Sequence, residues 1–243
     1  MVDAAEIGLR ASILEIGPGL GVLSHELAPR AARLYLVDVD TVLATRLERQ
    51  FADHEHVQVA TADFLSLDIE AVFPDPEIHI VASLPYNVAT PILFRLLDYR
   101  HKFRTATVMI QKEVAERLTA TPGTKAYGVP TVLTQLYGTV TTICTVGPRS
   151  FFPPPKVESQ IIRIEFQIQP RVPVDDDAEF RRMVKAAFAQ RRKTLRNALR
   201  AAGYENLDEA SEKTGIDFQR RGETLTVEEF AMLANTLAIR AST

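Results

Sequence analysis

The sequence predicts an α/β protein in which an open, mostly parallel sheet is followed by a small all-helical domain. Short apolar segments typical of strands alternate with helical segments over the first two-thirds of the chain. Glycine-rich or polar turns follow several of these strands, and beyond residue 177 the pattern is helical throughout. The 243 residues, of which 46% are hydrophobic and 24% charged, suffice for one domain or one and a half in an ordinary globular protein.

The run from Ile13 to Gly21 is the element around which the chain is organised. Its apolar first half predicts a buried parallel strand, and Val22, Leu23 and Leu27 predict a helix directly after it. The glycines in between allow positive φ angles and have no Cβ to exclude a ligand; they are Gly17, Gly19 and Gly21. A strand, a glycine turn and a helix in this order form the nucleoside site of Rossmann-like sheets.

The spacing of these glycines favours S-adenosylmethionine over NAD as the ligand. The dinucleotide fingerprint has its third glycine three residues after the second, whereas Gly21 follows Gly19 by only two. Pro18 also removes an amide donor that a pyrophosphate would use. The alternative interpretation of the loop alone is a tight turn in an α/β domain that binds no nucleoside.

Two acids follow the next two strands. Residues 34–37 predict the second strand, and Asp38 at its end lies 17 residues after Gly21, near the offset at which an acid binds both ribose hydroxyls. After a helix expected over residues 41–51, residues 57–60 predict the third strand. Asp63 follows that strand, where its carboxylate can accept a hydrogen bond from an adenine amino group.

A fourth strand over residues 78–82 leads into Ser83-Leu84-Pro85-Tyr86-Asn87, the segment that carries the expected chemistry. The amino group of adenine is a poor nucleophile because its lone pair is delocalised into the ring. Acceptors at its two protons draw the lone pair back to nitrogen, and the Ser83 oxygen and the carbonyls of Leu84 and Pro85 can supply them. Tyr86 adds an aromatic face. A Pro-Tyr turn without a catalytic role is the alternative for this segment alone.

The remaining elements of the first domain are two helices and three strands, expected over residues 89–99 and 111–118 and over residues 105–110, 136–146 and 160–168. A loop over residues 121–128 is expected to close on RNA. Three consecutive prolines, 153–155, form a stiff ridge behind Phe151, which would pre-position that ring. Residues 169–177 contain two prolines and three aspartates and predict a linker.

Positive charge is concentrated in the middle of the chain. The net charge is −3, but residues 101–200 carry +9, against −8 for residues 1–100 and −4 for residues 201–243. Four helices are expected over residues 178–190, 193–202, 207–214 and 227–237. The first two helices and the two residues between them contain one acid, Glu179, and eight cations: Arg181, Arg182, Lys185, Arg191, Arg192, Lys193, Arg196 and Arg200. This excess favours an RNA-phosphate surface over a merely solvated helix face.

Composition excludes several other classes of protein. The chain has no apolar run long enough to span a bilayer and no signal-peptide pattern, so a cytoplasmic location is expected and no membrane partner. The single cysteine, Cys144, allows no internal disulfide and no cysteine metal cluster, and we expect it to be a buried strand thiol. We therefore expect no bound metal.

A series of motifs occurs in order along nearly the whole chain: Glu15–Gly21, Asp38, Asp63-Phe64, Ser83–Asn87, Gln111–Arg117, Phe152–Ser159, Gln190–Asn197 and Arg221–Leu225. Together they resemble the rRNA adenine dimethyltransferases of the small-subunit type. That family has a class I S-adenosylmethionine-dependent methyltransferase sheet and methylates two adjacent adenosines near the 3′ end of small-subunit rRNA. The resemblance implies the same reaction here, with S-adenosylmethionine as cofactor, the immature small ribosomal subunit as partner and a monomeric enzyme.

The resemblance also assigns roles to residues. It implies a cofactor site made by Glu15, Gly17, Gly19, Gly21, Asp38, Asp63 and Ser83. It implies a catalytic set of Ser83, Leu84, Pro85, Tyr86 and Phe151, in which the rings of Tyr86 and Phe151 enclose the flipped adenine. The expected RNA-binding residues are Arg181, Arg182, Lys185, Arg191, Arg192, Lys193 and Arg196. The expected domains are residues 1–170 for catalysis, 171–177 as linker and 178–243 for RNA binding.

Two departures from the family separate the functional alternatives. The family has asparagine where this chain has Ser83, and it has a longer N-terminal segment with a Gln-Asn-Phe-Leu motif that closes over the cofactor. We expect a truncated start and weaker cofactor binding. A catalytically impaired ribosome-assembly or RNA-binding factor of the same fold is therefore the main alternative. A DNA adenine methyltransferase is a further one, which the basic helical domain and the full motif series disfavour.

Overall fold

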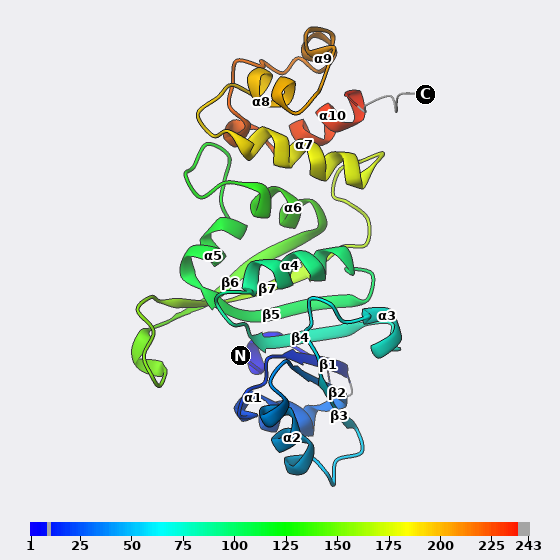
Figure 1. Cartoon of the computed structure of the whole chain (residues 1–243), viewed down its shortest axis with the longest axis vertical. Helices are drawn as coiled ribbons and strands as arrows, with labels where there is room; N and C mark the ends of the chain where they lie inside the picture. Colours follow the sequence, from blue (N-terminus) through cyan, green and yellow to red (C-terminus); the bar gives the residue numbers. More distant parts are fainter. Residues whose placement is uncertain (9–10, 238–243) are drawn as a thin grey trace. The chain divides into compact units, whose positions relative to one another are not determined.

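The computed structural model describes residues 1–8 and 11–237 (Figure 1). It consists of two compact units. The sheet unit comprises Met1–Ala115 and Gly138–Ile168, and the helical unit comprises Glu116–Tyr137 and the chain from Gln169 onward. The sequence predicts one boundary, at the linker, whereas the structure also assigns residues 116–137 to the helical unit.

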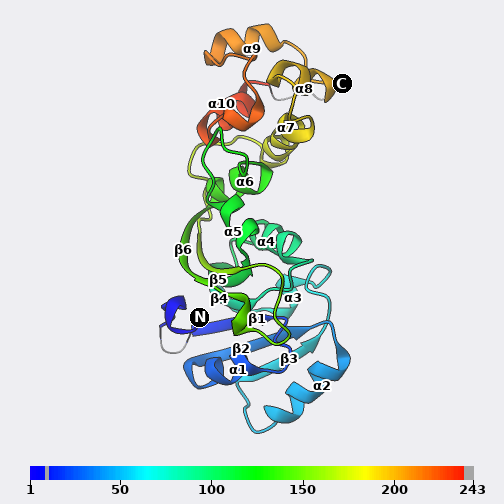
Figure 2. The same ribbon diagram turned by 90° about the vertical axis from the view of Figure 1, so that its left-hand side faces the viewer.

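Seven strands form one sheet in the order β3-β2-β1-β4-β5-β7-β6 (Figures 1 and 2). The strands are β1 (Ala11–Ile16), β2 (Ala31–Asp38), β3 (Val57–Thr61), β4 (Ile78–Ser83), β5 (Phe103–Gln111), β6 (Gly138–Val146) and β7 (Ser159–Phe166). The first five are parallel, and β7 lies antiparallel between β5 and β6. The expected mostly parallel sheet is confirmed.

The central strands are buried on both faces, which explains why they read as apolar runs without alternation. On one face Ile13, Leu34 and Leu47 belong to a core formed between the sheet and the first helices. On the other face Tyr35 meets Phe73 edge to face, with ring centroids 5.0 Å apart. This double burial fixes the strand ends at one edge, where the polar loops emerge.

The helices of the sheet unit are α1 (Val22–Leu27), α2 (Thr41–Gln50), α3 (Ile69–Val72), α4 (Ala89–Asp98) and the first turn of α5 (Lys112–Leu118), together with the 3-10 turns η1 (Asp3–Ala5), η2 (Ala28–Arg30) and η3 (Pro148–Ser150). Asp40 caps α2: its carboxylate accepts hydrogen bonds from the N–H groups of Val42 and Leu43 at 2.8 and 3.2 Å. Because this cap starts α2 at Thr41, only two residues separate the helix from the end of β2.

The helical unit contains α6 (Val129–Tyr137), α7 (Asp177–Ala189), α8 (Leu195–Ala201), α9 (Leu207–Thr214), the turn η4 (Gly222–Thr224) and α10 (Val227–Thr236). Asp176 caps α7, and Thr226 forms a capping box with Glu229 at the start of α10. Gly222 lies so close to α7 that an added Cβ would be 2.7 Å from the carbonyl oxygen of Ala187. The η4 turn therefore packs directly on the backbone of α7.

Two sequence expectations are wrong. The strand expected from residue 136 begins at Gly138, because residues 129–137 form α6, whose buried face includes Val132, Leu133 and Leu136. Cys144 is exposed, since β6 is the edge strand of the sheet. Within the described chain, every helix is too short or too polar to span a bilayer.

Candidate functional site

The glycine loop between β1 and α1 has the conformation that its sequence predicts. Gly17, Gly19 and Gly21 all have positive φ, at 68°, 58° and 84°. A Cβ on Gly21 would lie 2.7 Å from Cδ2 of Leu47 in α2, so both the backbone angle and the packing require glycine there. A Cβ on Gly19 would meet no atom within 4 Å, so the loop presents open backbone at that point.

Asp38 ends β2 and holds this loop in place. Its carboxylate accepts hydrogen bonds from the N–H of Gly19 at 3.1 Å and the N–H of Asp40 at 2.9 Å, and the residue is only 6% exposed. Each carboxylate oxygen has a second lone pair, so Asp38 can still accept from a ligand hydroxyl. The backbone carbonyl of Asp38 also accepts from the N–H of Ala62, which brings the Asp63 loop beside it.

Asp63 lies on that adjacent loop and is exposed. Its Oδ1 accepts from the N–H of Leu65 at 2.9 Å, which orients the carboxylate. Phe64 is buried directly after it and anchors the loop to the core. The structure thus brings Gly19, Asp38 and Asp63 to one edge of the sheet, as their places after parallel strands predict.

The loop after β4 reaches the same edge. A Cβ added to Gly17 would lie 3.6 Å from the Pro85 ring, so the glycine loop and the Ser83–Asn87 segment are neighbours, with room for about one methyl group between them. Ser83 ends β4 and is exposed, and the N–H of Leu84 donates to the Met109 carbonyl at 3.1 Å. The Pro85 carbonyl accepts from the N–H of Val88 at 3.1 Å, which closes a turn around Tyr86.

Tyr86 is held by a partner that sequence reasoning missed. Its hydroxyl lies 2.6 Å from Oγ of Ser159, the buried first residue of β7. The two residues are 73 positions apart, and only the insertion of β7 beside β5 brings them together. Phe151, the other expected ring, is half-buried in the segment between β6 and β7, and among the described residues no ring contact joins it to Tyr86.

Glu15 is a buried acid in the strand below the glycine loop. It is 2% exposed, and its Oε2 accepts from the Ser24 hydroxyl at 2.6 Å. The pKa of Glu15 is raised from 4.5 to about 7: burial is the main cause, the Ser24 hydrogen bond opposes it, and the nearby charge of Asp38 adds to it. Ser24 was not expected at the site; its place on α1 directly above the glycine turn is the signal that was available.

This shifted pKa predicts a pH-dependent stability. The folded protein holds the Glu15 proton more tightly than the unfolded chain, so the free energy of unfolding falls as pH rises from about 4.5 through about 7. The loss is roughly 3 kcal/mol, because one pKa unit corresponds to about 1.4 kcal/mol. We expect Glu15→Gln, which has no charge to bury, to gain stability relative to the parent at pH 8 but not at pH 4.5, as measured by urea unfolding.

The matched control for this experiment is Glu26→Gln, which removes an exposed acid from α1. The difference in unfolding free energy between Glu26→Gln and the parent should change much less between pH 4.5 and pH 8 than the difference for Glu15→Gln does. If the stability difference between the parent and Glu15→Gln is the same at both pH values, the buried charge does not limit stability.

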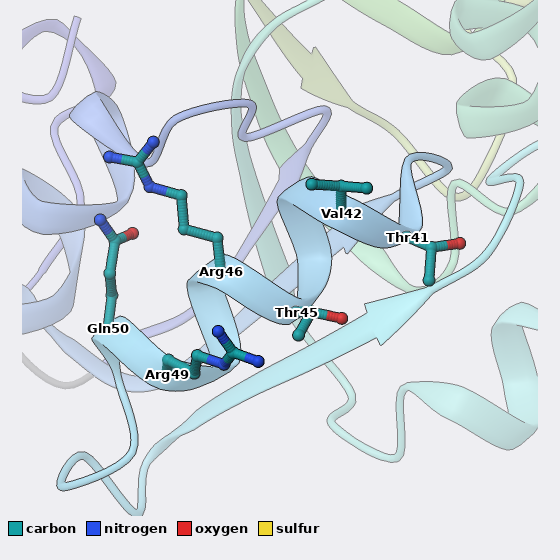
Figure 3. A pocket seen from close by; sticks show the side chains of 6 residues that line it. All are labelled: Thr41, Val42, Thr45, Arg46, Arg49 and Gln50. Atoms are coloured by element: carbon teal, nitrogen blue, oxygen red, sulfur yellow. The ribbon is translucent and has the colours of Figure 1, made fainter.

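A groove runs along α2, lined by Thr41, Val42, Thr45, Arg46, Arg49 and Gln50 (Figure 3). Figure 3 shows Arg46 and Gln50 extending toward the same side of the helix. Oε1 of Gln50 would lie 3.4 Å from a Cβ added to Gly21, so one end of the groove lies next to the glycine loop. None of the expected site residues lines it, and we do not assign the nucleoside to it.

The expected RNA-binding residues all lie in the helical unit, and the structure divides them into two groups. Four are engaged: Arg181 pairs with Asp177, Arg182 with Glu179 and the Tyr204 ring, Arg196 with Asp208, and Arg191 donates to the carbonyls of Lys125 and Tyr127. The other three are exposed, and their side chains have no hydrogen-bond or ion-pair partner among the described residues: Lys185, Arg192 and Lys193. These three are the cations best placed to meet phosphates.

No group of three or more His, Cys, Asp or Glu side chains within residues 1–8 and 11–237 has the arrangement of a metal site. At the edge of the sheet where the parallel strands end, the polar groups are hydrogen-bond acceptors. They are the carboxylates of Asp38 and Asp63, the Ser83 hydroxyl and the carbonyls beside it. Exposed apolar side chains flank them, with Val39 72% and Leu20 57% exposed. Such a mixed edge suits a ligand with a flat apolar face and several donor groups.

Comparisons with known proteins agree with this geometry. The family profile described as ribosomal RNA adenine dimethylase matches residues 1–239. A protein of Syntrophotalea carbinolica named ribosomal RNA small subunit methyltransferase A is 44% identical over 236 residues, covering 96% of this chain and 89% of that protein. A protein of the same name from Bacillus mycoides is 43% identical over 250 residues, covering 98% and 86%.

Two solved structures are similar over almost the full chain. A dimethyladenosine transferase from Plasmodium falciparum has a TM-score of 0.79 at 26% identity, covering 96% of this chain and 91% of that one. The 23S rRNA methyltransferase ErmE has a TM-score of 0.71 at 26% identity, covering 97% and 94%.

Proposed function

The chain belongs to the ribosomal RNA adenine dimethylase family, and we propose from this premise how its residues carry out the reaction. The protein is an S-adenosylmethionine-dependent rRNA adenine dimethyltransferase with a class I methyltransferase sheet. The proposed substrates are the amino groups of two adjacent adenosines near the 3′ end of small-subunit rRNA, in the immature subunit. We further propose that it acts as a monomer in the cytoplasm.

The residues at the carboxyl edge fit the cofactor. The open backbone at Gly19 leaves room for the amino-acid tail, and Asp38 lies where it can accept from the ribose hydroxyls. Asp63 can accept from the adenine amino group, and Val39 offers an apolar surface to the ring. When bound, the cofactor supplies an activated methyl group on a positively charged sulfur.

The Ser83–Tyr86 segment prepares the target amine. The Leu84 carbonyl and the Ser83 hydroxyl accept its two protons, which returns the lone pair to nitrogen. The Pro85 carbonyl is already shared with the N–H of Val88, so it is the weaker acceptor of the set. Tyr86 and Phe151 hold the adenine ring flat, and the proton is lost to water after methylation. The protein therefore contributes position and orientation rather than acid–base catalysis.

The close approach of Gly17 to Pro85, near enough that a Cβ on Gly17 would lie 3.6 Å from the proline ring, is the observation that carries this proposal. It places the cofactor loop against the loop that receives the target base, as direct transfer from sulfur to nitrogen requires. The test is transfer of tritiated methyl groups from S-adenosylmethionine to unmethylated small subunits, with large subunits and duplex DNA as competing acceptors. We expect label only in the small subunit; label in DNA, or none at all, contradicts the proposal.

Ser83 should limit turnover more than binding. A serine oxygen lies closer to the backbone than the asparagine oxygen of the family, so it holds the amine proton less directly. We expect Ser83→Asn to raise kcat by several-fold to about tenfold, the value of one hydrogen bond formed in the transition state. Single-turnover methylation rates and rRNA affinity are the measurements.

Ser83→Ala is the matched variant and should lower the rate further, with rRNA affinity unchanged. If all three proteins have the same rate, the backbone carbonyls suffice and the side chain has no role. If the parent transfers no methyl group and Ser83→Asn does not restore transfer, the assembly-factor alternative replaces the enzyme.

The exposed cations of the helical unit should determine the salt dependence of RNA binding. We expect Arg192→Ala combined with Lys193→Ala to weaken rRNA binding and to reduce the slope of log K against log salt by about 1.5, because each phosphate contact contributes roughly 0.7–0.9. Cofactor affinity should not change. Filter binding at several salt concentrations measures both quantities.

Arg182→Ala is the control, since its guanidinium is already engaged by Glu179 and Tyr204. It should leave the slope close to that of the parent. Equal slopes for all three proteins would show that the turn after α7 is only solvated surface.

A further inference from the structure

The segment between β6 and β7, residues 147–158, has features that the methyl-transfer proposal does not use. We call it the β6–β7 arm. Figure 1 shows it extending beyond the ends of the two strands, on the left of the view. It contains the short turn η3 and the proline ridge 153–155, so its outer part is stiff.

Phe152 lies at the outer part of the arm and is 101% exposed, more than any other large hydrophobic side chain of the described chain. Single exposed apolar residues are common, so exposure alone assigns no role. A complete phenyl ring held in water by a proline-stiffened backbone is different, because it presents both faces for stacking at little cost in ordering.

The unpaired charge of the arm is positive. Arg149 and Lys156 are exposed and have no hydrogen-bond or ion-pair partner within the described residues. The one acid of the arm, Glu158, is paired with Lys112 of α5 at 2.8 Å. The arm thus offers one aromatic face between two cations, which is the combination that binds single-stranded nucleic acid by stacking and phosphate contacts.

The base of the arm adjoins the proposed adenine site. Ser159 directly after the arm holds the Tyr86 hydroxyl, and Phe151 directly before Phe152 is the second proposed adenine-binding ring. A strand of RNA whose adenine lies against Tyr86 and Phe151 must therefore pass the arm on one side of that adenine.

We propose that the β6–β7 arm is a second RNA-contact element, in which Phe152 stacks on an unpaired rRNA base other than the methylated adenine. Arg149 and Lys156 bind the phosphates that flank that base. This inference rests on the proposed function, since it requires rRNA at the Tyr86 site. By holding that base, the arm sets the register of the RNA strand and thereby selects which adenosine reaches the Tyr86 site.

Tryptophan fluorescence provides a direct test, because the chain contains no tryptophan. Phe152→Trp places a single fluorophore on the arm, and a base stacked on it quenches its emission. Ile168→Trp is the matched control, since Ile168 is 63% exposed and lies two residues beyond the end of β7 that is farther from the arm. The probes are protein-free small-subunit rRNA and the unmethylated small subunit, each titrated into the full-length protein.

We expect both probes to quench Phe152→Trp and neither to quench Ile168→Trp to a similar extent. Quenching by the particle but not by free rRNA would indicate a ribosomal protein as the partner and overturn the proposal. Absence of quenching while filter binding shows that rRNA is bound would leave the arm without a role in RNA contact. Filter binding and methyl transfer by the parent are measured first, so failure of the proposed function is recognised separately.

Kinetics separates stacking from a general apolar contact. We expect Phe152→Ala to raise KM for the small subunit about tenfold with little change in kcat or cofactor affinity. Phe152→Leu keeps the apolar volume and should be as impaired as the alanine variant, whereas Phe152→Tyr should resemble the parent. Full activity of Phe152→Leu overturns the stacking role. Combined replacement of Arg149 and Lys156 by alanine should reduce the salt slope of rRNA binding by about 1.5.

Discussion

Tyr86→Ala is expected to lower methyl transfer by about a hundredfold or more while leaving cofactor affinity within a factor of two. The ring is proposed to hold the target adenine flat against the Ser83–Pro85 acceptors, and a misplacement of about 1 Å already costs on this order. Because the phenol hydroxyl is held by Ser159 of β7 and not by the cofactor loop, calorimetry with S-adenosylhomocysteine should give the parent value. Single-turnover transfer to unmethylated small subunits measures the loss.

Tyr86→Phe is the graded control for this prediction. It keeps the ring but removes the hydroxyl that lies 2.6 Å from Ser159, so we expect a loss of at most about tenfold. Ser159→Ala should cause a similar loss, and the double variant should be no worse than either single one if the two act through one hydrogen bond. Near-parent activity of Tyr86→Ala would remove the ring from the site.

Asp38→Ala is expected to weaken S-adenosylmethionine binding by roughly 5- to 150-fold, which corresponds to about 1–3 kcal/mol for hydrogen bonds to a charged group. The carboxylate has two roles: it is placed to accept from the ribose hydroxyls, and it fixes the N–H groups of Gly19 and Asp40. Its loss therefore removes a ligand contact and loosens the glycine loop. Calorimetry on the folded variant measures the affinity.

Asp38→Asn separates the two roles. The amide keeps the size of the side chain and one acceptor oxygen, so an intermediate affinity is expected. Asp53→Ala, which removes an exposed carboxylate elsewhere in the sheet unit, should bind the cofactor like the parent. An unchanged affinity for Asp38→Ala would place the nucleoside elsewhere on the protein.

The sheet and the edge of its site were predictable because local patterns determine them. The apolar runs of β1, β2 and β4 require burial on both faces, and an acid or a glycine directly after such a run must lie at the carboxyl edge. Helix α2 was equally clear, since Leu43, Leu47 and Phe51 recur at helical spacing on one face. These features need only short-range information.

The parts that were missed depend on contacts between distant residues. Residues 129–137 share a threonine-rich, partly alternating pattern with the following strand, and only burial distinguishes helix α6 from β6. The Tyr86–Ser159 contact arises from the sheet order and leaves no local signal. A count of charges likewise cannot show that Arg191 donates to the carbonyls of Lys125 and Tyr127, more than 60 positions away.

The central claim is that the edge formed by the glycine loop and the Ser83–Tyr86 segment transfers methyl groups to adenine in small-subunit rRNA. Its most direct test is mass spectrometry of small-subunit rRNA nucleosides after incubation of unmethylated subunits with the protein and S-adenosylmethionine. The account predicts N6,N6-dimethyladenosine at two adjacent positions near the 3′ end with the parent, and almost none with Tyr86→Ala. Methylation of another base, or equal dimethylation by Tyr86→Ala, would contradict it.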